Sequence, residues 1–230
     1  MPKKARCLAT QLNAGFSLVE LAIVLVVIGL IIGGVLKGQQ LIESARLKSV
    51  LSQLNEFRLA TGIFIDRFGG LPGDFQHAKE YIHSSLRNGS GNGIIEGAGL
   101  QAGTEAQQYW MHLSKAQLIS FSGSENSDSI GFGITAPASR LGGGYTVVYH
   151  PESDMPGHWY LLGEALNGHG DGALLTPAQA LSLDQQVDTG MPTSGRVRSF
   201  TGKGAKSECI VKGFYNLQYT GRACIMYFEF

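Results

Sequence analysis

The chain has 230 residues, 43% of them apolar, so it is long enough for one sizeable domain plus an anchor and too apolar for a disordered protein. Its 18 basic and 18 acidic residues balance, which gives no general case for nucleic acid as a partner, because proteins that bind nucleic acid usually carry a basic excess or a basic face. The 32 glycines favour a loop-rich body with many tight turns over a compact helical bundle.

The first fifteen residues carry three basic side chains and no acidic one, and an apolar stretch follows at once. This order is typical of a secretory or membrane-targeting signal whose basic residues stay in the cytoplasm. As a helix, residues 16–36 would be about 30 Å long, which matches the hydrocarbon core of a bilayer. A cleaved signal peptide and a plain signal anchor are the alternatives, although the stretch is long for the former and no clear small-x-small cleavage site follows before Lys37.

One carboxylate, Glu20, interrupts the apolar stretch near its start. An uncompensated charge in a membrane costs about 3 kcal/mol even on lenient insertion scales. Cleavage between Gly15 and Phe16 would create an α-amine roughly 6 Å along a helix from Glu20. This new cation, on the same chain or on a neighbour shifted by about one turn, could form a charge-assisted pair with the carboxylate.

The segment GFSLVEL, which begins at Gly15 and lies between a basic leader and an apolar run, resembles the processing signal of bacterial type IV pilins and type II secretion pseudopilins. The resemblance implies cleavage after Gly15 by the prepilin peptidase and N-methylation of Phe16. It also implies that Glu20 pairs with the Phe16 amine of a neighbouring subunit and so sets the stagger of a filament. The implied partners are other pilin subunits, in a homo- or hetero-filament, and an inner-membrane assembly platform.

A single long helix is predicted to follow the leader of residues 1–15, with a transmembrane or filament-core part over 16–37 and an amphipathic part over 38–68. Apolar side chains recur in the second part at mostly three- and four-residue steps, at Leu47, Val50, Leu51, Leu54, Phe57 and Phe64. Gly69 and Gly70 should end the helix. Gly29, Gly33, Gly34 and Gly38 allow either close helix packing or local melting of the first part.

Residues 69–230 are predicted to form a globular periplasmic domain. Asp74 is expected to cap a helix over residues 75–86, and Thr104 and Thr176, each with Gln three residues later, should begin two more helices over 105–119 and 178–188. The runs typical of strands are 145–150, 159–162, 196–201, 214–219 and 223–230. The predicted fold class is therefore α+β, with the long N-terminal helix packed on a small antiparallel sheet, a layout that the pilin resemblance also implies.

The cysteines indicate an exported domain. Cys7 lies in the leader, which leaves Cys209 and Cys224 as an even pair near the C-terminus. An oxidising compartment would join them, and closing a loop of about fifteen residues stabilises a fold by roughly 3 kcal/mol in the chain-entropy model. Two free buried thiols are the alternative.

Three segments could hold a cation. The segments NGSGNGII from Asn88 and NGHGDGAL from Asn167 resemble the start of a calcium loop, with ordinary Gly/Asn turns as the alternative. Asp184 and Asp188 are four residues apart at a helix end, where their repulsion should be offset by Arg196, Arg198, a loop amide or Ca²⁺. The candidate metal ligands are Asp171, Asp184 and Asp188.

The motifs of common enzymes are missing from the sequence, which has no H-E-x-x-H, C-x-x-C or G-x-S-x-G segment. The alternative is a membrane-anchored enzyme whose catalytic triad comes from residues distant in sequence. The pilin resemblance implies instead a structural subunit of a pilus-like or type II secretion filament, inserted in the bacterial inner membrane by a single span. A minor pilin that acts as an adhesin or a DNA-uptake module is the other alternative, and its support is the basic cluster of Lys203, Lys206, Lys212 and Arg222.

Overall fold

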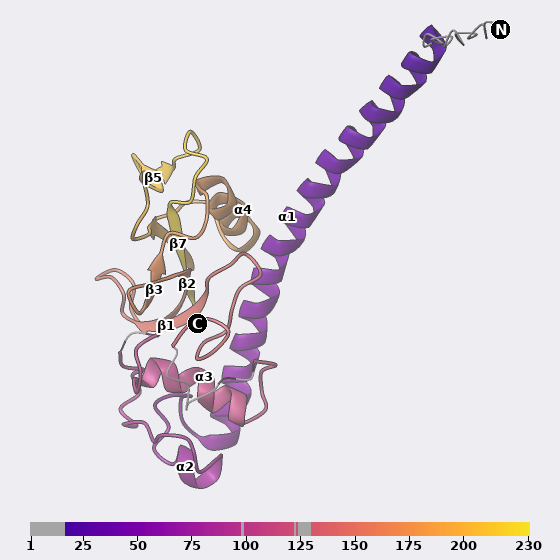
Figure 1. Cartoon of the computed structure of the whole chain (residues 1–230). Helices are drawn as coiled ribbons and strands as arrows, with labels where there is room; N and C mark the ends of the chain where they lie inside the picture. Colours follow the sequence, from indigo (N-terminus) through magenta and orange to yellow (C-terminus); the bar gives the residue numbers. More distant parts are fainter. Residues whose placement is uncertain (1–16, 98, 122, 124–129) are drawn as a thin grey trace, which may run out of the picture. The chain divides into compact units, whose positions relative to one another are not determined.

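The structure is a computed structural model that describes residues 17–97, 99–121, 123 and 130–230 (Figure 1). The chain divides into two compact units, Met1–Ser44 and Ala45–Phe230. The predicted processing residues Gly15 and Phe16, together with Cys7, lie outside the described residues. Helix α1, Leu18–Phe68, contributes its first part to the smaller unit and its second part to the larger unit, which we call the body.

Helix α1 confirms the prediction of one long N-terminal helix. It is helical through Gly29, Gly33, Gly34 and Gly38. Within the described part of the chain, α1 is the one helix that is long and apolar enough to cross a membrane. Gly69 ends it as expected, since its φ of 76° is readily adopted by glycine and its N–H donates to the Ile65 carbonyl at 2.8 Å.

The second part of α1 supplies one side of the body's core. Of the predicted apolar stripe, Leu51 is half-buried and packs against the core. The other five side chains are buried, which confirms the stripe: Leu47, Val50, Leu54, Phe57 and Phe64. Phe57 meets the rings of two buried residues edge-on, with centroid distances of 4.9 Å to Trp110 and 5.2 Å to Tyr145. Such aromatic contacts add about 0.5–1.5 kcal/mol each beyond the area that they bury.

An antiparallel sheet supplies the other side of the core, in the order β1-β2-β7-β4, with β3 paired to the end of β2. These strands are β1 Gly144–Tyr149, β2 His158–Leu166, β3 His169–Gly172, β4 Val197–Thr201 and β7 Cys224–Glu229. Because side chains alternate between faces, Val147, Tyr160 and Phe228 share the core face across neighbouring strands. The α+β layout of helix and antiparallel sheet is thus as predicted.

Two of the three shorter helices form where their capping residues predict. Helix α3, Glu105–Lys115, begins at Thr104, whose side chain accepts from the Gln107 N–H, and α4, Pro177–Val187, has a complete capping box between Thr176 and Gln179. The helix predicted over 75–86 is wrong, because α2 spans only Ala78–Tyr81. Its N-cap is His77, and the carboxylate of Asp74 is used elsewhere.

The strand predictions are confirmed for β1, β2, β4 and β7, and they are wrong or missing for the short strands β3, β5 and β6. The strand expected over 214–219 is wrong beyond Tyr215, since β6 is only Phe214–Tyr215 and pairs with β5, Ile210–Val211. Cys209, directly before β5, is joined by a disulfide to Cys224, the first residue of β7, with 5.0 Å between their Cα atoms. The predicted disulfide is confirmed, and the alternative of two free thiols does not apply.

Candidate functional site

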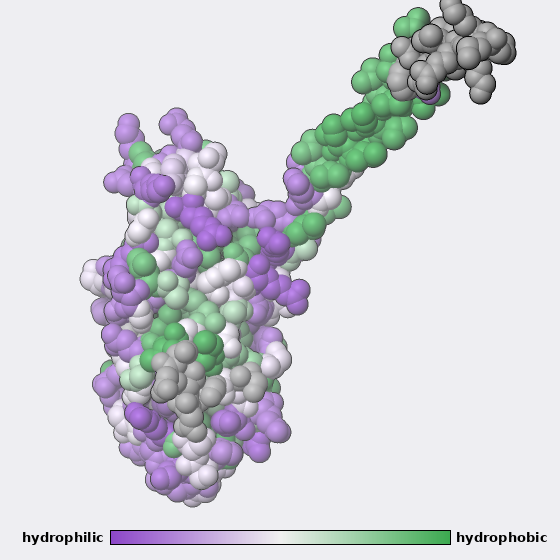
Figure 2. All heavy atoms as spheres, in the orientation of Figure 1, coloured by the Kyte–Doolittle hydropathy of each residue, from purple (hydrophilic) through white to green (hydrophobic). Residues whose placement is uncertain are grey.

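From Leu18 to Leu36, helix α1 presents a continuous apolar surface with one acidic side chain at its start. Leu18, Leu25 and Leu30 are 86%, 70% and 72% exposed, and Figure 2 shows apolar side chains along this part of the helix. Glu20 lies in the first turn of α1 and is exposed. None of the described residues forms a hydrogen bond or ion pair with its carboxylate. Pairing of Glu20 with the Phe16 amine stays a prediction, because Phe16 is outside the described part of the chain.

A buried hydroxyl cluster fixes the second part of α1 on the body. The Thr61 hydroxyl lies 2.5 Å from the phenol oxygen of Tyr109 on α3, and that oxygen lies 2.8 Å from the phenol oxygen of Tyr160 on β2. Burial raises the pKa of both phenols, so they stay neutral and serve as hydrogen-bond donors. About one helical turn earlier on α1, the Arg58 guanidinium donates to the Glu229 carbonyl at 3.1 and 2.5 Å. These bonds set the register of α1 on the sheet.

The three candidate metal ligands have protein partners. Asp171 forms an ion pair with Lys203 at 2.6 Å. Asp184 is fully buried, where its carboxylate accepts from the Tyr215 hydroxyl at 2.7 Å and from the Gly190 N–H at 3.1 Å, and burial raises its pKa. Asp188 accepts from the Arg196 N–H at 2.5 Å.

Loop amides therefore offset the repulsion between Asp184 and Asp188, and a loop amide is one of the compensating groups predicted for this pair. Within the described residues, no group of three or more His, Cys, Asp or Glu side chains is arranged to hold a metal ion. Calcium binding by these three acids stays an untested prediction, and none of their contacts requires it.

The loop formed by the first glycine-rich segment, which begins at Asn88, points backbone N–H donors inward, whereas a calcium loop points oxygen ligands inward. The carboxylate of Asp74, which is 4% exposed, accepts from the N–H groups of Gly91 at 2.6 Å, Asn92 at 3.1 Å and Gly93 at 2.8 Å. The Glu105 carboxylate accepts from the N–H groups on either side of them, at Ser90 and Glu96. Because backbone N–H groups point inward here, this loop binds carboxylates of its own chain.

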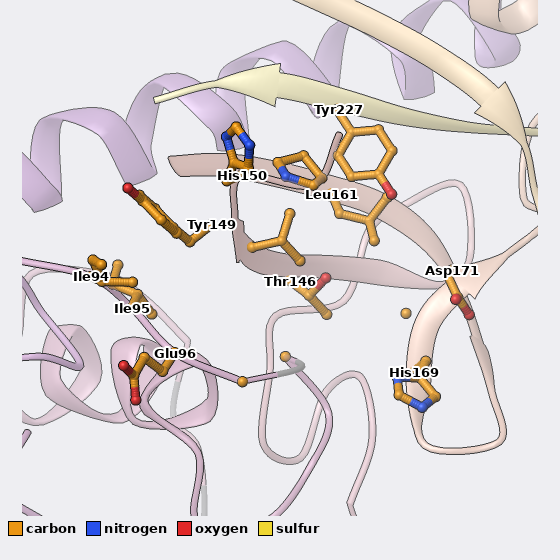
Figure 3. Close-up of a pocket in the computed structure, with 15 residues that line it drawn as sticks. Ile94, Ile95, Glu96, Thr146, Tyr149, His150, Leu161, His169, Asp171 and Tyr227 are labelled. Carbon is orange, nitrogen blue, oxygen red and sulfur yellow. The ribbon is translucent and has the colours of Figure 1, made fainter. Parts of the chain in front are cut away.

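The open face of the sheet carries a cavity of about 690 Å³ (Figure 3). We call it the sheet-face cavity. Its floor includes Thr146 of β1, Leu161 of β2 and Tyr227 of β7. Both glycine-rich segments line it from opposite sides. Ile94 and Ile95 end the first segment and Glu96 follows it, whereas His169, Gly170 and Asp171 lie in the part of the second segment that forms β3. The two segments that share the sequence pattern N-G-x-G-x-G thus line the same cavity.

The charges around the sheet-face cavity are negative. Glu96 and Asp171 line it, and no Lys or Arg is among its lining residues in the part of the chain that the structure describes. Burial, and then Asp171 and Glu152 nearby, raise the pKa of the Tyr227 phenol to about 12. The carboxylate of Asp171 gives one oxygen to Lys203, while its Oδ1 is buried and accepts no hydrogen bond from a described residue. The exposed carboxylate of Glu96 therefore makes the cavity suited to a ligand that brings a positive charge.

The predicted basic cluster is only partly free. Lys203 pairs with Asp171, and Arg222 lies 3.6 Å from the Glu164 carboxylate. Lys203, Lys206 and Arg222 line a second cavity, of about 510 Å³. Lys212 is separate, at the turn between β5 and β6 with a φ of 51°. Two of the four basic side chains are thus neutralised by neighbours, which weakens this surface as a site for a polyanion.

Sequence reasoning missed the hydroxyl cluster and the sheet-face cavity. Thr61, Tyr109 and Tyr160 come from three distant elements, and nothing local marks them as partners. The pattern N-G-x-G-x-G that the two glycine-rich segments share was the one available sequence signal for the cavity. The chain matches no protein-family model, and neither a curated protein nor a solved structure shows significant similarity to it. Functional inference therefore depends on the residues themselves.

Proposed function

We propose that this protein is a structural subunit that assembles, after cleavage between Gly15 and Phe16 by a prepilin peptidase, into a type IV pilus-like or type II secretion filament. The observation that carries the proposal is the carboxylate of Glu20, which has no partner among the described residues and lies in the first turn of a helix whose following side chains are apolar and exposed. Exposed apolar surface of this extent needs a membrane or a set of partner helices to cover it.

The apolar surface keeps this helix in lipid or among partner helices, away from water. Moving a Leu or Ile side chain from water to an apolar environment gains about 1.5–3 kcal/mol, but lipid already provides such an environment. Apolar burial alone therefore does not fix how far one helix is shifted along the next. Glu20 does so, because a stagger that leaves a carboxylate unpaired among apolar helices is strongly disfavoured. The new amine of Phe16 on a neighbouring subunit is the counter-ion in this mechanism.

The same features support a location in the bacterial inner membrane with the body in the periplasm. Helix α1 is long enough to cross a bilayer, and the basic leader would remain on the cytoplasmic side. The Cys209–Cys224 disulfide fits an oxidising compartment. In this proposal the partners are an inner-membrane assembly platform and further subunits of the same or a related kind, and the body has a structural rather than an enzymatic role.

Replacement of Glu20 tests the mechanism. The Glu20→Ala variant should insert and be cleaved normally, as judged by membrane fractionation and by mass spectrometry of an N-terminus at Phe16, but it should yield few filaments in sheared surface material under negative stain. Glu43→Ala, at the next acid along α1, is the matched control and should assemble. Normal filament yield from Glu20→Ala would contradict the role of Glu20. A purified protein that still begins at Met1 would contradict the processing.

A further inference from the structure

The β5–β6 hairpin exposes apolar side chains where a hairpin in water would carry polar ones. We call residues 211–214 the hairpin tip. Val211 and Phe214 are cross-strand partners on its outer face and are 42% and 62% exposed, whereas Tyr215 on the inner face is buried. Leu217, just beyond the hairpin, is 56% exposed. Clusters of this kind with a charged neighbour are typical of interaction surfaces.

The hairpin tip is held in a defined shape. Lys212 and Gly213 form its turn with φ angles of 51° and 82°, the positive values that tight two-residue hairpins require. The disulfide of Cys209, directly before β5, ties the base of the hairpin to β7. The tip is therefore a preorganised projection with one cation at its end, so little conformational freedom would be lost when it binds a partner.

The sheet-face cavity has the complementary properties. Its lining combines apolar side chains such as Val148 and Leu161 with the aromatic ring of Tyr149. Its acidic lining groups among the described residues are Glu96 and Asp171, on opposite sides. Asp171 is already paired with Lys203 of its own chain, so the exposed Glu96 is the carboxylate that an incoming cation can reach. An apolar segment that brings one ammonium group would satisfy both the floor and the rim of this cavity.

We propose that the hairpin tip of one copy of this chain docks into the sheet-face cavity of the next copy, with Lys212 facing the carboxylate of Glu96 and Phe214 against the apolar floor. Each chain offers one tip and one cavity, on different elements, so the contact is heterologous. Repeated head-to-tail contacts of this kind generate a ring where the rotation closes and an open helical assembly where it does not, and the proposed filament is the open case. The inference adds a body-to-body contact to the proposed filament and rests on that function only for the presence of a neighbouring copy.

Cross-linking at zero length tests the contact directly. Equal amounts of ¹⁵N-labelled and unlabelled full-length protein are reconstituted together in vesicles and treated with a carbodiimide, which joins an amine to a carboxylate that it contacts. The expected product is a peptide pair that links Lys212 to Glu96 and contains one labelled and one unlabelled partner. Absence of this link, or a link found only within one isotope, would overturn the proposal.

Charge reversal provides the matched test. Lys212→Glu should reduce the covalent dimer at least tenfold, and Glu96→Lys should do the same, whereas the double variant K212E/E96K restores an attractive pair and should return most of the dimer. Lys206→Glu, an equal charge change before the same hairpin, is the control and should behave like the wild type. The proposal fails if K212E matches the wild type, if K206E has the same effect as K212E, or if the double variant is no better than either single one.

Filament yield separates the two proposals. If Glu20→Ala abolishes filaments while K212E changes neither filaments nor dimer, the filament function stands and the docking contact is wrong. If Glu20→Ala assembles normally but the Lys212 link is present and depends on charge, the contact stands and the proposed register mechanism is wrong.

Discussion

Replacing His112 with asparagine should make the stability of the body less dependent on pH. His112 lies on α3 and is fully buried. Its Nδ1 accepts from the Gly73 N–H at 2.9 Å, and its Nε2 lies 2.9 Å from the Arg87 carbonyl, so Nε2 carries the proton of a neutral ring. A second proton would have to go to Nδ1, and the Gly73 bond would then be lost. An asparagine side chain in this place carries no charge at any pH, while its oxygen could still accept from the Gly73 N–H.

The size of the effect follows from the pKa. Burial lowers the pKa of His112 from 6.5 to about 4, and the bond to Arg87 opposes only part of that. Because the unfolded chain takes up a proton near pH 6.5 and the native protein does not, His112 contributes its full stability above that pH. The contribution falls as the pH drops toward 4, and the total loss is about 3 kcal/mol, most of it by about pH 4.5.

Urea unfolding of the full-length protein in a non-ionic detergent, followed by the fluorescence of Trp110 and Trp159, measures this loss. The stability gap between wild type and His112→Asn should narrow by about 2–3 kcal/mol between about pH 7.5 and pH 4.5, since carboxylates that titrate in this range affect both proteins alike. His83→Asn, at an exposed site after α2, controls for loss of a surface histidine. If wild type and His112→Asn lose stability in parallel, the buried neutral imidazole is not the cause of the acid sensitivity.

Two further predictions concern the loop around Asp74 and the disulfide. Asp74→Asn should lower the free energy of unfolding by about 2 kcal/mol and speed hydrogen exchange at Gly91–Gly93, because an amide NH₂ would face a backbone N–H donor that now meets a carboxylate oxygen. The control Asp66→Asn, at an exposed position of α1, should have little effect on either measurement. Equal exchange rates in wild type and Asp74→Asn would argue against a role of Asp74 in anchoring this loop. The double variant Cys209→Ser/Cys224→Ser should be less stable than the oxidised wild type by about 3 kcal/mol in urea unfolding at neutral pH. If the variant is less stable than the reduced wild type by the same amount, the serines and not the missing disulfide are responsible.

The regular elements could be predicted from sequence because their signals are local. The stripe from Leu47 to Phe64 repeats at helical spacing, and Thr176 with Gln179 satisfies its own helix end. Strands β1 and β7 carry the alternating or apolar runs that sheets bury. These elements form as expected because their tertiary environment agrees with their local preference.

The failures have a common cause, which is competition from distant partners. Asp74 has the right chemistry for a helix cap, but the amides of residues 91–93 take its carboxylate and leave α2 with four residues. Strand β3 has the sequence HGDG, whose glycines disfavour extended pairing, and it forms only because β2 continues beyond the main sheet to meet it. The sheet-face cavity was out of reach for the same reason, since its floor and walls come together only after the sheet has formed.

The place of β7 in the sheet has a consequence for the order of events during folding. This strand is the last in the chain and yet lies between β2 and β4, so those two have no link to each other until it arrives. A folding chain would show two unpaired strand edges to its surroundings for that interval, and unpaired edges invite mispairing with other chains. Oxidation of Cys209 must wait for the same moment, because its partner Cys224 is the first residue of the strand that closes the gap.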